Sequence, residues 1–157
     1  MKSPRSLALL AGALFGLASL ALAADVPTEV IQYDHTRLET TFKDGAPGAL
    51  QVNPLYKVMV SRRVAAAPGE IHMKDTDVFY IVGGSATFVT GGTVVDQTPV
   101  KLPDGTPNPV EFHFKSSTGG TEHHLQTGDA IIVPKGTPHQ FTKIDGSFQY
   151  FVVKVTE

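Results

Sequence analysis

Short apolar runs separated by glycine and proline dominate the chain after residue 24. They lack the sustained 3.6-residue apolar spacing that marks an amphipathic helix. Most are rich in Val, Ile, Phe, Tyr and Thr, which is typical of strands. The expected strands are Leu55–Val64, Val78–Val82, Ala86–Thr90, Val110–Lys115, Thr121–Leu125, Ala130–Val133, Gln140–Ile144 and Phe148–Val155. So many strands in one domain predict an all-β sandwich or barrel.

The faces of these runs differ. Val110–Lys115 alternates between apolar and polar residues, as expected of a strand with one face in water. Val78–Val82, Ala130–Val133 and Phe148–Val155 are apolar on both faces. Such strands need a second sheet or a partner subunit on the far side, so a homodimer is expected.

The segment Gln97–Pro109 is rich in proline and contains Asp104-Gly105, a strong turn signal. It is expected to be a loop inserted between the two halves of the domain. Two interpretations stay open: a surface excursion, or a flap over an opening.

Residues 1–23 have the pattern of a signal peptide. Lys2 and Arg5 precede an uncharged stretch rich in Leu and Ala, which ends in the small residues Ala21 and Ala23. We therefore expect cleavage after Ala23 or Ala24 and an exported, periplasmic or secreted protein. An uncleaved membrane anchor is the alternative, because the apolar stretch approaches the length that spans a bilayer.

Removal of residues 1–23 changes the composition only slightly. It takes away two of 13 basic residues and none of the 15 acidic ones, so the formal charge falls from −2 to −4 over residues 24–157. This acidic balance gives no indication of nucleic-acid binding, and no membrane contact is expected once the leader is gone. The chain has no cysteine, which excludes disulfides, thiolate metal sites and cysteine nucleophiles.

Two segments carry the candidate chemistry, residues 68–84 and 128–139. Each combines a turn and a strand with a histidine, His72 in the first and His139 in the second. With Asp77 they supply two imidazoles and one carboxylate, a set that binds Fe, Mn, Ni or Zn as a divalent ion. The alternative for Asp77 is a turn residue that accepts backbone hydrogen bonds at the start of a strand.

The second segment resembles the second motif of the cupin superfamily, G-x5-P-x-G-x2-H. Gly128, Pro134, Gly136 and His139 occupy its four fixed positions. The resemblance implies a cupin-like double-stranded β-helix, or jelly roll, in a single domain spanning residues 24–157.

The first segment resembles the first cupin motif, G-x5-H-x-H-x3,4-E-x6-G, only in part. Asp77 stands in place of the glutamate and Gly84 closes the motif. With His72 taken as the first histidine, Lys74 replaces the second, and the interval to the carboxylate is short. The resemblance thus implies His72, Asp77 and His139 as metal ligands.

Strand alternation in such a barrel places further residues inside. Phe79 is expected on the inner face with Asp77, and Phe141 and Lys143 on the inner face with His139. Phe79 and Phe141 are therefore candidates for substrate binding. Arg63 is a candidate to bind a substrate carboxylate, against the alternative of a solvated arginine.

Two residues near the candidate ligands have several interpretations. Lys74 is a solvated loop residue, a charge partner that neutralises Asp77 in place of a metal, or a catalytic proton donor. His123 could point inward as an additional metal ligand, whereas His35, His113 and His124 are expected at the surface.

These observations lead to two functional hypotheses of different kinds. The first is an exported cupin that binds one divalent metal and acts on a small organic molecule, with oxidation, isomerisation, lyase or hydrolytic chemistry left open. The second is a metal-free, non-catalytic cupin that only binds a small molecule. A purely structural unit would have a filled barrel instead of a cavity.

Overall fold

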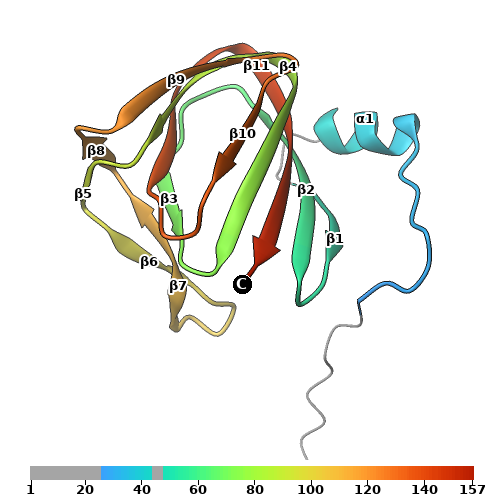
Figure 1. Cartoon of the computed structure of the whole chain (residues 1–157), viewed down its shortest axis with the longest axis horizontal. Coiled ribbons are helices and arrows are strands. Elements are labelled where there is room, and N and C mark those ends of the chain that lie inside the picture. The colour runs from blue at the N-terminus through green and yellow to red at the C-terminus, as the bar shows by residue number, and fades with distance from the viewer. Residues whose placement is uncertain (1–25, 44–47) are drawn as a thin grey trace, which may run out of the picture.

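A computed structural model describes residues 26–43 and 48–157 (Figure 1). The proposed signal peptide, residues 1–23, lies outside the described residues. Within the described part, no helix has the length and apolar character needed to cross a membrane. The elements are α1 (His35–Lys43), β1 (Gly48–Val52), β2 (Tyr56–Arg63), β3 (Gly69–His72), β4 (Asp75–Thr90), β5 (Thr93–Val95), β6 (Thr98–Lys101), β7 (Pro107–Phe114), β8 (Ser116–Thr118), β9 (Thr121–Gln126), β10 (Ala130–Val133) and β11 (His139–Thr156).

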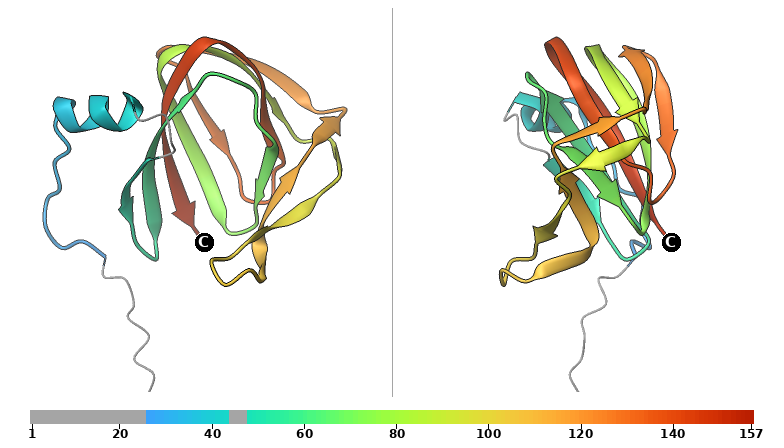
Figure 2. Two further views of the ribbon diagram at one scale, coloured as in Figure 1. Left: turned by 180° about the vertical axis from the view of Figure 1, so that it is seen from behind. Right: turned by 90° about the vertical axis from the view of Figure 1, so that its left-hand side faces the viewer.

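The strands curl around a common interior, and α1 stands outside them (Figures 1 and 2). Nine strands form one sheet with the path β1-β2-β11-β3-β7-β6, and β4 joins it by pairing with β9, β10 and β11. The strands pair antiparallel, and β5 and β8 form a separate ribbon. The expected jelly-roll class of all-β fold is therefore confirmed.

Strands β4 and β11 are longer than the sequence pattern predicts. The runs 78–82 and 86–90 are parts of β4, and the runs 140–144 and 148–155 are parts of β11. Each strand bends between its two runs, where their pairing is irregular between Asp145 and Gln149. Gly84 lies in this bend with φ of 78°, and a Cβ there would meet the carbonyl oxygen of Ser147 at 2.0 Å.

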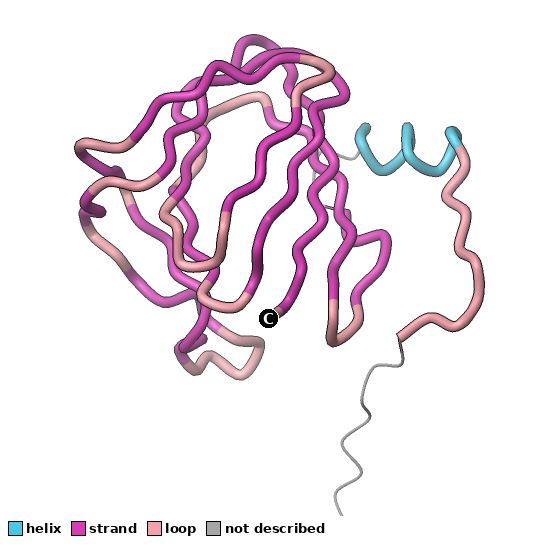
Figure 3. Tube along the Cα trace, viewed as in Figure 1, coloured by secondary structure: helices cyan, strands magenta, loops and turns pink. Residues whose placement is uncertain are grey.

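The segment 97–109 is mainly strand, contrary to the expectation of a loop. Residues 98–101 form β6 and residues 107–114 form β7, which pair antiparallel. The predicted turn at Asp104-Gly105 connects them (Figure 3), with Gly105 at φ of 85°. Pro99 is tolerated in β6 because this is an edge strand, where one side needs no backbone donor.

Helix α1 was not expected from the sequence. Asp34 caps its first turn, because the Asp34 carboxylate accepts a hydrogen bond from the backbone N–H of Arg37 at 2.8 Å. Leu38 and Phe42 are four positions apart and pack on the same apolar cluster beside β1 and β2. The Phe42 ring meets Phe151 of β11 edge to face, with ring centroids 6.0 Å apart.

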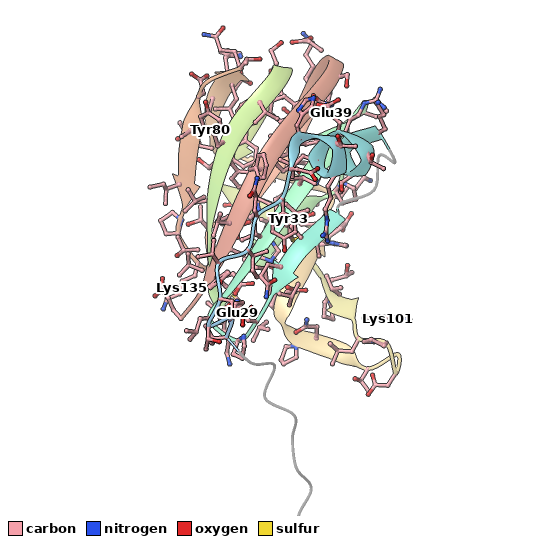
Figure 4. All side chains as sticks on the ribbon, turned by 90° about the vertical axis from the view of Figure 1, so that its right-hand side faces the viewer. Glu29, Tyr33, Glu39, Tyr80, Lys101 and Lys135 are labelled. Atoms are coloured by element: carbon pink, nitrogen blue, oxygen red, sulfur yellow. The ribbon has the colours of Figure 1, made fainter. Side chains whose placement is uncertain are left out.

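This helix explains part of the apolar outer face that suggested a dimer. Figure 4 shows α1 and Tyr33 against the strands, whereas Tyr80 lies away from the helix. Tyr80 on β4 and Ile132 on β10 are 51% and 64% exposed. The helix therefore covers one part of the face, and another part stays open.

The interior of the barrel is filled at one end by packed aromatic side chains. They occupy inward positions of the two long strands β4 and β11, namely Phe79, Phe88, Phe141, Phe148 and Tyr150. The expected inward orientation of Phe79 and Phe141 is confirmed by their burial. Lys143 differs, because a register shift after Phe141 turns it outward, where its ammonium contacts Asp145 at 2.8 Å.

Candidate metal and ligand site

A cavity of about 320 Å³ opens beside the aromatic core. Strand β2 contributes the alternate residues Lys57, Met59, Ser61 and Arg63 to its wall. The remaining wall comes from β3 and the loop before it, from β4, β6 and β7, and from both parts of β11. Its size is at the lower end of the range for small-molecule sites.

His139 reaches the cavity through the turn that follows β10. Gly136 adopts φ of 75°, which favours glycine, and its N–H donates to the carbonyl oxygen of His72 at 2.7 Å. His139 Nδ1 lies 3.0 Å from the carbonyl oxygen of Thr137. A carbonyl only accepts hydrogen bonds, so Nδ1 carries the proton and Nε2 keeps a free lone pair.

Strand β3 brings Glu70 and His72 to the same cavity, because residues two apart on a strand share a face. Glu70 is directly opposite His139 in the antiparallel ladder. Glu70 Oε2 lies 3.3 Å from His72 Nε2, and the two imidazole ring centroids are 5.4 Å apart. One ligand atom from each of Glu70, His72 and His139 lies within 4.8 Å of the other two.

Asp77 lies at the floor of this site and is 1% exposed. Its Oδ2 is 3.7 Å from the Nε2 atoms of both His72 and His139. The same oxygen accepts a hydrogen bond from Lys154 Nζ at 2.5 Å. The neutralising charge that Asp77 requires therefore comes from Lys154.

Several buried polar atoms around this site have no hydrogen-bond partner within the described residues. They are His72 Nδ1, Asp77 Oδ1 and His139 Nε2. Unpaired buried polar atoms are costly, and a group of them facing one cavity indicates a missing ligand, ion or water. Two imidazoles and a carboxylate are also suitable donors for a divalent transition metal, so Glu70, His72 and His139 fit one.

The electrostatic environment keeps two of these donors in the state that a cation requires. Burial raises the pKa of Glu70, but the hydrogen bond with His72 and the nearby positive charge of Lys154 outweigh it and lower that pKa to about 2. Burial lowers the pKa of His139 below its ordinary value. Near neutral pH, Glu70 is therefore ionised and His139 is neutral.

Arg63 lies over the aromatic part of the wall, as the sequence interpretation of an inward arginine requires. Its guanidinium carbon is 5.4 Å from the centroid of the Phe141 ring and 5.9 Å from that of Tyr150. Its Nε donates to the Tyr150 hydroxyl at 2.8 Å, and its Nη2 lies 3.8 Å from Glu70 Oε1.

Two other predicted site residues lie away from the cavity. Lys74 is exposed, and its backbone oxygen accepts a hydrogen bond from the N–H of Glu157. The hypothesis that Lys74 neutralises Asp77 is wrong, because Lys154 has that position. His123 Nε2 lies 2.9 Å from the Thr90 hydroxyl and does not line the cavity.

The structure also corrects how the first motif is aligned. Glu70 and His72 have the two-residue spacing of the paired histidines, and four residues separate His72 from Asp77. Glu70 thus stands in place of the first histidine and His72 is the second, so Lys74 has no motif position. The interval to Asp77, which seemed short, then agrees with the motif.

The strand order, the barrel interior and the two motif segments define a cupin-type double-stranded β-helix. Residues 114–157 match the family described as the AraC-like ligand binding domain. No curated protein matches the chain.

Solved structures are similar to the chain in fold. A protein with a double-stranded β-helix domain from Klebsiella pneumoniae matches with a TM-score of 0.53 and 14% identity, over 82% of this chain and 91% of that one. BH2720 from Bacillus halodurans matches with a TM-score of 0.56 and 13% identity, over 85% and 86%. The chain has a cupin fold, and identities this low show the fold alone.

Another similar structure is much longer. The DMSP lyase DddQ from Ruegeria pomeroyi DSS-3 matches with a TM-score of 0.45 and 18% identity, over 67% of this chain. The chain spans only 40% of that protein.

Proposed function

We propose that this chain binds a small organic molecule in the barrel cavity, together with one divalent cation held by Glu70, His72 and His139. The observation that carries this proposal is the convergence of their ligand atoms within 4.8 Å of one another. The unpartnered His139 Nε2 also supports it, because that atom has a free lone pair directed away from Thr137.

A bound cation would supply Lewis acidity toward an oxygen of the small molecule. The chain's own residues hold the surroundings of the cation in place. The carbonyl oxygen of Thr137 fixes the orientation of the His139 ring. Glu111 Oε1 lies 3.9 Å from Nδ1 of His72, the ring nitrogen that does not face Glu70. Imidazole and carboxylate donors suit Fe, Mn, Ni or Zn.

Metal-free binding of a small molecule is a second candidate function. It is favoured by the ion pair between Lys154 and Asp77, which holds a positive charge beside the Asp77 carboxylate. The same carboxylate oxygen lies 3.7 Å from Nε2 of His72 and of His139. In this case Lys154, His72 and His139 would bind polar groups of the ligand directly. Both candidates use the same cavity and differ in metal content.

Metal analysis of the purified chain separates the two candidates. The protein is loaded in turn with Fe(II), Mn(II), Ni(II) or Zn(II), freed of excess ion and measured by mass spectrometry. We expect about one equivalent in the wild type and below about a tenth in Glu70→Gln, His72→Ala and His139→Ala. His124→Ala is the matched control, because the His124 side chain is 79% exposed and does not line the cavity.

The outcome depends first on the wild type. If it retains less than about a tenth of an equivalent of every ion, the metal proposal fails and the metal-free candidate remains. If the three variants retain as much as His124→Ala, the ion is bound elsewhere. Circular dichroism of each variant excludes loss of fold as the cause.

Export and self-association complete the proposal. The basic, apolar and small-residue pattern of residues 1–23 supports export. The exposed Tyr80 and Ile132 support a homodimer through the outer face of β4 and β10. Light scattering of the wild type and Ile132→Lys tests the dimer, which the lysine should dissociate.

A further inference from the structure

We infer that the small molecule carries a carboxylate, which Arg63 binds through both terminal nitrogens of its guanidinium. This inference deepens the proposed function and relies on its cavity. It names the chemical class of the ligand as a small carboxylic acid with an apolar body.

Arg63 is held in position but is not saturated. The Tyr150 hydroxyl accepts the hydrogen bond of Nε, and the rings of Phe141 and Tyr150 lie against the guanidinium. Neither terminal nitrogen donates a hydrogen bond within the described residues, since Glu70 Oε1 lies 3.8 Å from Nη2. A planar fork with two free donors matches the geometry of a carboxylate.

The other cations of the wall are already engaged. Lys154 Nζ is 2.5 Å from Asp77, and Lys57 Nζ is 2.7 Å from Asp75. Arg63 is therefore the basic residue of the described wall that has no carboxylate within hydrogen-bonding distance. A ligand anion that binds Arg63 would not have to displace a carboxylate hydrogen-bonded to it, as it would at Lys57 or Lys154.

The charge of the wall also favours an anion once a cation is bound. In the described residues, three basic side chains line the cavity with three acidic ones, namely Lys57, Arg63, Lys154, Glu70, Asp77 and Glu111. A divalent ion adds positive charge to this balanced set, and Glu70 would be shared between the ion and Arg63. An anionic ligand offsets part of this added positive charge in a partly buried site.

The position of Arg63 further limits the ligand. Glu70 lies between Arg63 and His72, with its Oε1 toward the guanidinium and its Oε2 toward the imidazole. A carboxylate on Arg63 is therefore next to the candidate metal ligands. Met59, Phe112 and Val152 line the same cavity and provide apolar contacts for the rest of the molecule.

Titration calorimetry with matched acids and amides tests the inference on the full chain. The probes are benzoate against benzamide and phenylacetate against phenylacetamide, which have similar shapes and differ in charge. We expect at least one acid to bind about tenfold more tightly than its amide. Arg63→Met should remove this preference, and Arg63→Lys should lose most of it because an ammonium lacks the planar fork.

Arg62→Met is the matched control. Arg62 is the adjacent residue of β2, its Nε donates to the Ser147 hydroxyl, and it does not line the cavity. Its affinity for the acids should stay within about twofold of the wild type. Circular dichroism must show that Arg63→Met keeps the fold, and the comparison is made on chelated protein so that a change in metal content cannot cause the difference.

The results separate this inference from the metal proposal. The inference is overturned if no acid binds, if the amides bind equally well, or if Arg63→Met keeps the preference. Each titration is repeated after chelation of metal. Preference for acids that depends on Arg63 in a chain that takes up no metal would support the inference while the metal proposal fails.

Discussion

Lys154 Nζ donates a hydrogen bond to Asp77 Oδ2 at 2.5 Å, although the two residues are 77 positions apart in the chain. Asp77 is near the start of β4 and Lys154 is near the end of β11, where the register pairs them directly. Both residues are buried. Asp77, which stands in place of the glutamate of the first motif, is thus already neutralised by the Lys154 ammonium. Glu70 remains as a carboxylate that can bind a metal ion.

Loss of one partner of this pair should destabilise the fold strongly. Lys154→Met leaves the Asp77 carboxylate buried without its cation, which costs about 3–5 kcal/mol in the free energy of unfolding. Urea denaturation of the chelator-treated protein measures this change. The double variant Asp77→Leu with Lys154→Met should recover most of the loss, because no unpaired charge remains.

A surface ion pair provides the control for this experiment. Lys135 Nζ lies 2.6 Å from Glu157 Oε2, and both side chains are exposed. Lys135→Met should lower the free energy of unfolding by less than about 1 kcal/mol. An equally small loss for Lys154→Met would show that the buried pair is not needed for stability.

Acid should destabilise the protein in two steps. His139 has a pKa below its ordinary value of 6.5, so the unfolded chain binds more protons and stability falls as the pH decreases below about 6.5. Glu70 has a pKa of about 2 in the folded chain against 4.5 ordinarily. Its stabilising contribution is complete above pH 4.5 and is lost as the pH falls from 4.5 toward 2.

Urea midpoints measured between about pH 8 and about pH 2 check these windows. Glu70→Gln should reduce the loss of stability below pH 4.5, while the His139 step and the contribution of other carboxylates with lowered pKa, such as Asp75, remain. The exposed Glu122→Gln is the control and should keep both steps. A profile of Glu70→Gln parallel to the wild type throughout would contradict the assignment.

A methyl group at Gly69 should displace strand β3. An ideal Cβ at this position would lie 2.1 Å from a carbon of the Phe114 ring, which is buried. Gly69→Ala should therefore cost about 1–3 kcal/mol in stability. Because Glu70 and His72 follow on the same strand, metal affinity should also fall.

The companion change in Phe114 tests this explanation. Gly69→Ala combined with Phe114→Leu removes the ring atoms that the new methyl group meets. This double variant should recover metal affinity relative to Gly69→Ala, as measured by a competitive chelator titration. Unchanged metal affinity in Gly69→Ala itself would show that β3 tolerates the methyl group without moving.

Helix α1 should depend on its single buried side chain. Phe42→Ala removes the ring that packs on Phe151 and Val60, at a cost of about 3–5 kcal/mol if the helix stays docked. Undocking instead would appear as fast hydrogen exchange confined to residues 35–43. Thr36→Ala, at an exposed position of the same helix, should change neither the unfolding free energy nor the exchange appreciably.

The sequence pattern predicts the strands well because alternation and turn residues are local signals. Gly136 and His139 could be assigned from a motif with four fixed positions, and strand alternation correctly places Phe79 and Phe141 inside. Lys143 escapes the same rule because a bulge after Phe141 changes the face. Helix α1 has only Leu38 and Phe42 as apolar contacts, too few for a periodic signal.

The site was less predictable because its partners come from distant strands. Lys154 lies between two valines in a run that looks apolar, although its alternation with Tyr150 and Val152 places it on their inward face. Glu70 could have been found from its two-residue spacing to His72. The role of Glu70 was missed because the alignment of His72 and Lys74 with the two histidines of the motif is equally good. Each alignment matches one histidine and lacks the other.

Strand β11 supplies His139 at its start and Lys154 near its end, and it is hydrogen-bonded to both β2 and β4. Its pairing is therefore a precondition for the whole site, and the cavity cannot assemble before the last strand has docked. Folding and acquisition of binding competence should be one cooperative event. Slow hydrogen exchange of the β11 amides and retention of ligand should then be lost together as denaturant is raised.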